Sequence, residues 1–218
     1  MRVIMLNGSR HFDGTTAQAL QVIGQQLQQN NIEVVTVQLD SVSGYKDCDG
    51  CNQCKQTGHC RHEDIVNDII DLLQEADGLI LTSPTHFGGI TGSMKIVLDR
   101  LWYATDNLAF FALKPAAVVA VCRRTGAINT WHQLSNYLGC ANLLHMGSQY
   151  WAILYGEEAA DTALDKEGLQ TMQILGDNMA WLLTAIDAVK DTIVKPEPKA
   201  RQKTNFCRIE QFDQAEAN

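Results

Sequence analysis

Residues 78–100, GLILTSPTHFGGITGSMKIVLDR, contain the pattern that decides the fold. The run GLILT at 78–82 is short and apolar, and a polar turn follows it, which predicts a buried strand. A loop with a proline and two glycines occupies 83–91, and apolar residues at helical spacing then predict a helix over 94–103. A strand, a loop and a helix in this order form the repeating unit of a parallel α/β sheet.

The same unit recurs along the chain. Four further strands are predicted, at 2–6, 32–39, 115–122 and 143–146. Four further helices are predicted, at 15–29, 65–73, 129–138 and 165–189. Because right-handed crossovers place helices on both faces of such a sheet, we expect an α/β fold, a doubly wound five-stranded parallel sheet. We expect one domain over 1–190, with a cysteine-rich loop inserted at 40–62 and an extended tail over 191–218.

Composition excludes several classes of partner. The 218 residues carry a formal net charge of −8, which disfavours nucleic acid and anionic membranes because phosphates are repelled on average. No apolar run reaches the ~18 residues that a membrane span needs. The start, MRVIMLNGSR, runs from a strand straight into a glycine turn, unlike a signal peptide. With seven cysteines, this predicts a cytoplasmic protein in a reducing compartment.

Three loops follow the carboxyl ends of predicted strands, where such sheets bind ligands: 7–16, 83–91 and 122–127. The first, GSRHFDGTT at 8–16, leads into a helix N-terminus, whose free amides favour an anion. It matches neither GxGxxG nor GxxxxGK[ST], and its hydroxyl and arginine donors suit a single terminal phosphate. The alternative is a polar turn that ends in a threonine N-cap.

The other two loops suit a flat ring. His86 and Phe87 are flanked by small residues, so they can lie along a ring while the backbone approaches closely. Arg123–Gly126 can place cations and amides beside a ring edge. The alternatives are an ordinary surface or core histidine and a solvated basic turn.

The three loop motifs, GSRHFDGTT, SPTHFGGITGSMKIVLDR and VAVCRRTGA, resemble the NADPH-dependent FMN reductase family, which is flavodoxin-like. The middle motif is similar to that family's SPVYFGSVSGQLKAFIDR, with His86 where tyrosine is common. Later stretches, LDKEGLQTMQILGDNMAWL and KTNF, also look like this group, so the resemblance covers about residues 1–206.

The resemblance implies an FMN-dependent NAD(P)H oxidoreductase that serves a small acceptor such as a flavin or quinone. No catalytic acid or base is required. The expected phosphate-binding residues are Ser9, Arg10, Gly14, Thr15 and Thr16. The residues expected to border the isoalloxazine ring are Pro84, Thr85, His86, Phe87 and Gly88, and those expected at its pyrimidine side are Arg123, Thr125 and Gly126.

Four cysteines, at Cys48, Cys51, Cys54 and Cys60, spell C-x2-C-x2-C-x5-C. Compact runs of this kind hold iron–sulfur clusters, whereas structural zinc usually takes two separated pairs. The loop also resembles that of iron–sulfur flavoproteins, a branch of the same family that carries a [4Fe-4S] cluster there. A cluster, free or redox-active thiols, and zinc all remain open at this point, and a cluster implies an electron carrier fed by a ferredoxin-like donor.

Two further expectations concern class and assembly. A binding or regulatory protein that shares the fold is the alternative to an enzyme, because one fold hosts many functions. The resemblance implies a homodimer or homotetramer, and the aromatic residues at 102, 103, 110, 111, 150 and 151 supply either a subunit contact or core packing.

Overall fold

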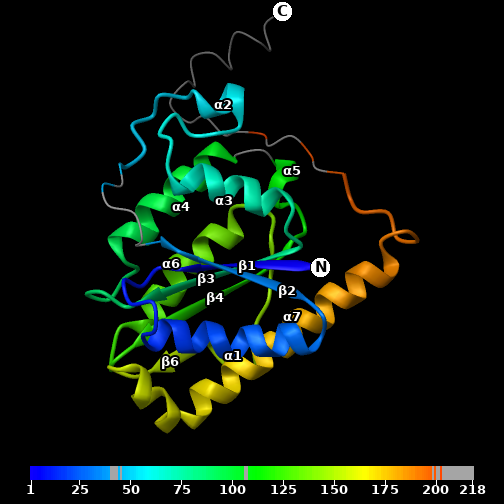
Figure 1. Ribbon diagram of the computed structural model, residues 1–218. Coiled ribbons are helices and arrows are strands. Elements are labelled where there is room, and N and C mark those ends of the chain that lie inside the picture. The colour runs from blue at the N-terminus through cyan, green and yellow to red at the C-terminus, as the bar shows by residue number, and fades with distance from the viewer. Residues whose placement is uncertain (40–43, 45, 106–107, 198, 200–201, 203–218) are drawn as a thin grey trace, which may run out of the picture.

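The computed structural model describes residues 1–39, 44, 46–105, 108–197, 199 and 202 (Figure 1). Its strands form one parallel sheet in the order β2-β1-β3-β4-β5, with β6 also paired to β4. The strands are β1 (Arg2–Asn7), β2 (Glu33–Gln38), β3 (Gly78–Pro84), β4 (Pro115–Cys122), β5 (Leu144–His145) and β6 (Ile153–Tyr155). The order is that of the flavodoxin-like doubly wound fold, which confirms the predicted fold class.

The fifth strand position is divided in two. β3 pairs with one side of β4 over Ala116–Val121, so β5 and β6 must share the other side. β5 pairs with the beginning of β4 and β6 with its end. β6 was not predicted, because a three-residue strand is too short to show a periodic pattern.

The five predicted helices are present, each within two residues of its expected ends. They are α1 (Thr15–Gln29), α3 (Ile65–Gln74), α4 (Gly92–Ala104), α6 (Ala127–Gly139) and α7 (Lys166–Val189). Three short helices were not predicted: α2 (Cys54–Thr57) inside the cysteine loop, α5 (Leu108–Phe111) and the 3₁₀ helix η2 (Ala159–Leu164). The tail expected over 191–218 lies mostly outside the described residues.

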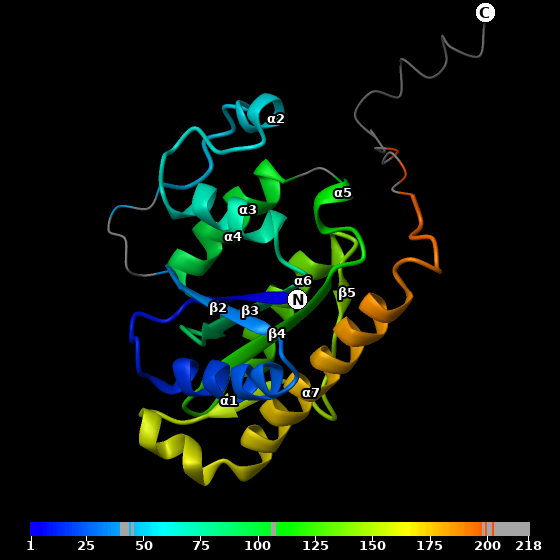
Figure 2. The same ribbon diagram turned by 45° about the vertical axis from the view of Figure 1, so that its right-hand side comes forward.

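Helices cover both faces of the sheet (Figures 1 and 2). Successive strand side chains point to opposite faces. Ile4 and Leu6 of β1 therefore belong to a core with α3, α4 and α6. Val3 and Met5 belong to the second core, with α1 and α7. This arrangement leaves the carboxyl ends of the strands free for the loops that form the site.

The aromatic residues divide between core and surface. Trp102 stacks on the buried Phe111 with ring centroids 4.8 Å apart, so these two side chains pack in the core. Tyr150 and Trp151 are 58% and 47% exposed. In the part of the chain that the structure describes, no helix is both long enough and apolar enough to cross a bilayer.

Candidate functional site

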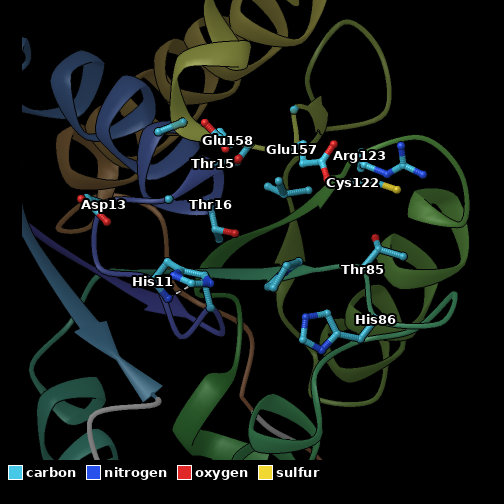
Figure 3. Close-up of a pocket in the computed structure, with 16 residues that line it drawn as sticks. His11, Asp13, Thr15, Thr16, Thr85, His86, Cys122, Arg123, Glu157 and Glu158 are labelled. Carbon is cyan, nitrogen blue, oxygen red and sulfur yellow. Dashed lines mark hydrogen bonds between the residues drawn. The ribbon is translucent and has the colours of Figure 1, made fainter.

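The three predicted loops meet around a cavity of about 490 Å³ at the carboxyl ends of β1, β3 and β4. The predicted residues that line it are Ser9, Gly14, Thr15, Thr16, Pro84, Thr85, His86 and Arg123. Figure 3 shows His11 and Thr16 on one side of this cavity and Thr85, His86 and Cys122 on the other. The site is therefore built from segments far apart in the sequence.

Hydrogen bonds between residues close in sequence hold the first loop in place. The Ser9 N–H donates to Asn7 Oδ1 at 3.0 Å, and Ser9 Oγ accepts from the His11 N–H at 3.1 Å. A Cβ at Gly8 would lie 3.1 Å from the Thr82 carbonyl oxygen and 3.0 Å from Met94 Cε. Glycine at this position therefore lets the ends of β1 and β3 approach closely enough to bring their loops together.

The N-terminus of α1 faces the cavity without a side-chain cap. Its N-cap is Gly14, and no side chain of the described residues makes a capping hydrogen bond there. The alternative prediction of a threonine N-cap is therefore wrong. Thr15 and Thr16 are buried at the first two helical positions. Amides that point outward from a helix N-terminus, aided by the helix dipole, form a site for an anion.

The β3 loop contributes an unpartnered hydroxyl. The Thr85 N–H donates to the Val121 carbonyl at 2.8 Å, which joins this loop to the end of β4. Thr85 Oγ1 is buried and has no hydrogen-bond partner among the residues that the structure describes. A buried hydroxyl without a partner costs about 1–3 kcal/mol, so a ligand that bonds to it is favoured.

The third loop turns tightly around Cys122. Cys122 Sγ donates to the Thr125 carbonyl at 2.8 Å and accepts from the Arg124 N–H at 3.3 Å. Gly126 has a φ of 90°, and a Cβ there would lie 3.0 Å from the Gly88 Cα. The second and third loops are therefore in direct contact through two glycines.

Sequence reasoning missed a fourth wall. The cavity is also lined by Gly156, Glu157 and Glu158, which connect β6 to η2, and by Ala159 at the start of η2. The N–H groups of Glu157 and Glu158 both donate to Asp161 Oδ2, at 3.0 and 2.9 Å, which fixes this turn beside Thr15. The only sequence signal was the short run that became β6, and it is too brief to place a loop.

Some predicted residues do not line the cavity. Among the described residues these are Arg10, Phe87, Gly88, Thr125 and Gly126. Phe87 is fully exposed with a φ of 51°. Gly126 instead lines an adjoining cavity of about 420 Å³, together with Tyr150, Trp151 and Tyr155. Contact between these residues and a ligand remains a prediction.

The four cysteines of the loop line one small cavity of about 20 Å³. Cys48 and Cys51 are exposed, Cys60 is half-buried and Cys54 is buried. Burial raises the pKa of the Cys54 thiol, and the neighbouring thiols of Cys51, Cys60 and Cys48 raise it further. Within the described ranges, no group of three or more His, Cys, Asp or Glu side chains is arranged to hold a metal ion.

Comparisons with known proteins identify a matching family and a relative that covers most of the chain. The family described as NADPH-dependent FMN reductase matches residues 1–158. An iron–sulfur flavoprotein of Methanocaldococcus jannaschii is 29% identical over 195 residues, which cover 85% of this chain and 99% of that protein.

Two solved structures share the fold. RosB, with bound 8-demethyl-8-formylriboflavin-5′-phosphate, superposes with a TM-score of 0.67 at 16% identity and covers 96% of this chain and 94% of its own. The apo form of an NADH:FMN oxidoreductase superposes with a TM-score of 0.60 at 16% identity and covers 83% of this chain and 89% of its own. Identities this low show likeness of fold alone.

Proposed function

Because the chain belongs to the NADPH-dependent FMN reductase family, we propose that the cavity between its three loops is the FMN site and that electrons pass from there to a small oxidant. The protein is an FMN-dependent NAD(P)H oxidoreductase. FMN, when bound, supplies the hydride and electron transfer, and the protein supplies binding, orientation and electrostatics. The acceptor we propose is a free flavin, a quinone or another small oxidant.

The observation that supports this assignment most strongly is the N-terminus of α1, which faces the cavity without a side-chain cap from the described residues. A second is the Thr85 hydroxyl, which is buried without a partner in the described part of the chain. The donor set fits a ligand with a dianionic end and a planar polar end. The amides at the start of α1, with the hydroxyls of Ser9, Thr15 and Thr16, would hold the phosphate. Thr85 Oγ1 would donate to or accept from the ring.

The remaining predicted residues have supporting roles in this proposal. Pro84 and His86 border the cavity from the β3 loop, and Arg123 from the β4 loop. Glu157 and Glu158 line the same cavity beside Thr15. No side chain has to move a proton in this scheme, and we assign none to that role.

The test is anaerobic mixing of the FMN-loaded protein with NADH or NADPH, followed by a panel of acceptors. We expect one of the two nucleotides to reduce the flavin and a flavin or quinone to reoxidise it. A protein that takes up no FMN would instead support the binding or regulatory alternative.

A second candidate function is electron transfer through a [4Fe-4S] cluster on the cysteine loop, and a specific observation favours it. All four thiols line one cavity, and Arg61 and Arg100 line it with them. Thiolates are the ligands of such clusters. A ferredoxin-like protein is the electron donor we propose in that case.

Counting iron and acid-labile sulfide in anaerobically purified protein tests this candidate. About four of each per chain would support the cluster. Flavin with no iron, after reconstitution with iron and sulfide, would leave a simple FMN reductase with a thiol loop.

Assembly and location complete the proposal. We propose a homodimer or homotetramer, with the exposed Tyr150 and Trp151 as contact residues. Sedimentation of wild-type protein against Trp151→Ser tests this. We also propose a cytoplasmic location, because seven cysteines, four of them in one loop, suit a reducing compartment.

A further inference from the structure

A second cavity, of about 420 Å³, adjoins the proposed FMN cavity at the sheet edge formed by β6. Ligand pockets commonly span about 300–1,000 Å³, so this cavity is large enough for a small molecule. Tyr155 of β6 lines it and pairs with Cys122 of β4, which lines the FMN cavity. Gly126 also lines the second cavity, and a Cβ there would lie 3.3 Å from Thr85 Cγ2 in the first. A molecule in the second cavity would therefore lie next to bound FMN.

Three exposed aromatic side chains line this second cavity: Tyr150, Trp151 and Tyr155. The rings of Tyr150 and Trp151 lie edge to face, with centroids 4.6 Å apart. Burial raises the pKa of the Tyr155 hydroxyl, and the neighbouring Cys122, Asp165 and Tyr150 raise it further, so this phenol is neutral near pH 7. The faces of aromatic rings carry partial negative charge and attract cations. Because each ring has two faces, this role is compatible with the subunit contact proposed above.

The charged groups of the lining are acidic. The carboxylates of Asp165 and Glu167 line the second cavity, and no lysine or arginine of the described residues lines it with them. Asp165 caps α7, since its Oδ1 accepts from the Gly168 N–H at 2.9 Å and its Oδ2 from the Tyr155 N–H at 2.8 Å. The N-termini of α6, at Gly126, and of α7 add about half a positive charge each. Two full negative charges outweigh them, so the cavity favours a cation.

We propose that the second cavity binds the electron acceptor and that this acceptor is a planar aromatic cation. The inference rests on the oxidoreductase function proposed above. The faces of Tyr150, Trp151 and Tyr155 would attract the charged ring, and Asp165 and Glu167 would balance its charge. The cation takes up two electrons and one proton, all supplied by NAD(P)H, which becomes NAD(P)⁺, and the acceptor becomes uncharged. The reduced acceptor loses its attraction to the rings and carboxylates, so the cavity binds the oxidised form more tightly than the product.

The experiment compares three compounds that share one ring system and differ in charge: N-methylphenazinium, phenazine and phenazine-1-carboxylate. Calorimetric titration of the oxidised, FMN-loaded protein measures the affinity for each without turnover, while FMN fills the first cavity. The variants are Glu167→Gln, which removes one charge, Tyr155→Leu, which removes one ring, and Tyr155→Phe, which keeps the ring. Asp68→Asn is the matched control, because Asp68 is an exposed acidic residue in the first turn of α3 and does not line this cavity.

We expect wild-type protein to bind N-methylphenazinium about tenfold more tightly than phenazine-1-carboxylate, with phenazine between them. Tyr155→Leu should weaken binding of the cation about 2- to 5-fold more than binding of phenazine, the range for one exposed cation–π contact, and Tyr155→Phe should restore it. Glu167→Gln should weaken binding of the cation about 2- to 5-fold, and added salt should reduce this difference. Asp68→Asn should change none of the three affinities.

Equal affinities for the three compounds, tighter binding of the anion, or equal effects of Glu167→Gln and Asp68→Asn would overturn the proposal. Flavin that is reduced by NAD(P)H in a protein without the charge preference would overturn this inference alone, and the proposed function would stand. A protein that prefers the cation, yet whose flavin neither nucleotide reduces, would support the cation site and overturn its role as the acceptor site together with the proposed function.

Discussion

Replacing Thr85 with valine tests the FMN site with two readouts of opposite sign. Valine keeps the shape of threonine but lacks the hydroxyl, and Thr85 Oγ1 is buried without a partner. An unsatisfied buried hydroxyl costs about 1–3 kcal/mol. The FMN-free variant should therefore be more stable than wild type by that amount, which raises Tm by about 2–4 °C per kcal/mol in a domain of this size.

The affinity for FMN should fall, whereas the stability of the FMN-free protein should rise. If the flavin provides the missing partner in wild type, the valine variant forgoes that gain and binds FMN about 5- to 150-fold more weakly, for the same 1–3 kcal/mol. Thermal unfolding of the FMN-free protein and fluorescence titration with FMN measure the two effects.

Thr82→Val is the matched control. Thr82 Oγ1 is also buried without a partner, but Thr82 does not line the cavity. It should give the gain in stability with no change in FMN affinity. Unchanged FMN affinity in Thr85→Val, or equal losses in both variants, would refute the assignment of Thr85 as a flavin contact.

Three further predictions follow from named contacts. Thr16→Val, at the uncapped start of α1, should weaken FMN binding about 10- to 100-fold, which is the range for a hydrogen bond to a charged group. Binding of riboflavin, which lacks the phosphate, should not change. Equal losses of affinity for both ligands would contradict a phosphate role for Thr16. Gly126→Ala forces a side chain into a φ of 90° and within 3.0 Å of the Gly88 Cα, so urea unfolding should show a loss of about 1–2 kcal/mol or more; a neutral effect would mean that the two loops separate easily. Burial lowers the pKa of Lys114 to about 8 from 10.5. Between these two pH values the unfolded chain binds more protons than the folded one, so the free energy of unfolding should rise with pH across that window. Lys114→Met should lack this rise, and parallel pH profiles of the two proteins would contradict the prediction.

The sequence was sufficient for the long elements and for the three loops at the ends of β1, β3 and β4. Buried parallel strands such as PAAVVAVC at 115–122 are continuous apolar runs, and α7 shows helical spacing over many turns, so both are visible without a partner. The family resemblance, carried by the same loops, is confirmed by the match over residues 1–158.

What the sequence did not reveal depends on tertiary contacts. β6 is a strand only because it pairs with the end of β4, and it carries Glu157 and Glu158 to the cavity. The unpartnered Thr85 hydroxyl and the contact between Arg100 and Cys60 join residues that no local pattern relates.

The most direct test of the central claim is the anaerobic absorbance spectrum of the FMN-loaded protein before and after one equivalent of NADPH or NADH. We predict that the visible band of oxidised flavin disappears with at least one of the two nucleotides. A band that persists with both nucleotides, yet disappears on addition of dithionite, would show that FMN is bound but receives no hydride from a nicotinamide, and the assignment as an NAD(P)H oxidoreductase would be wrong.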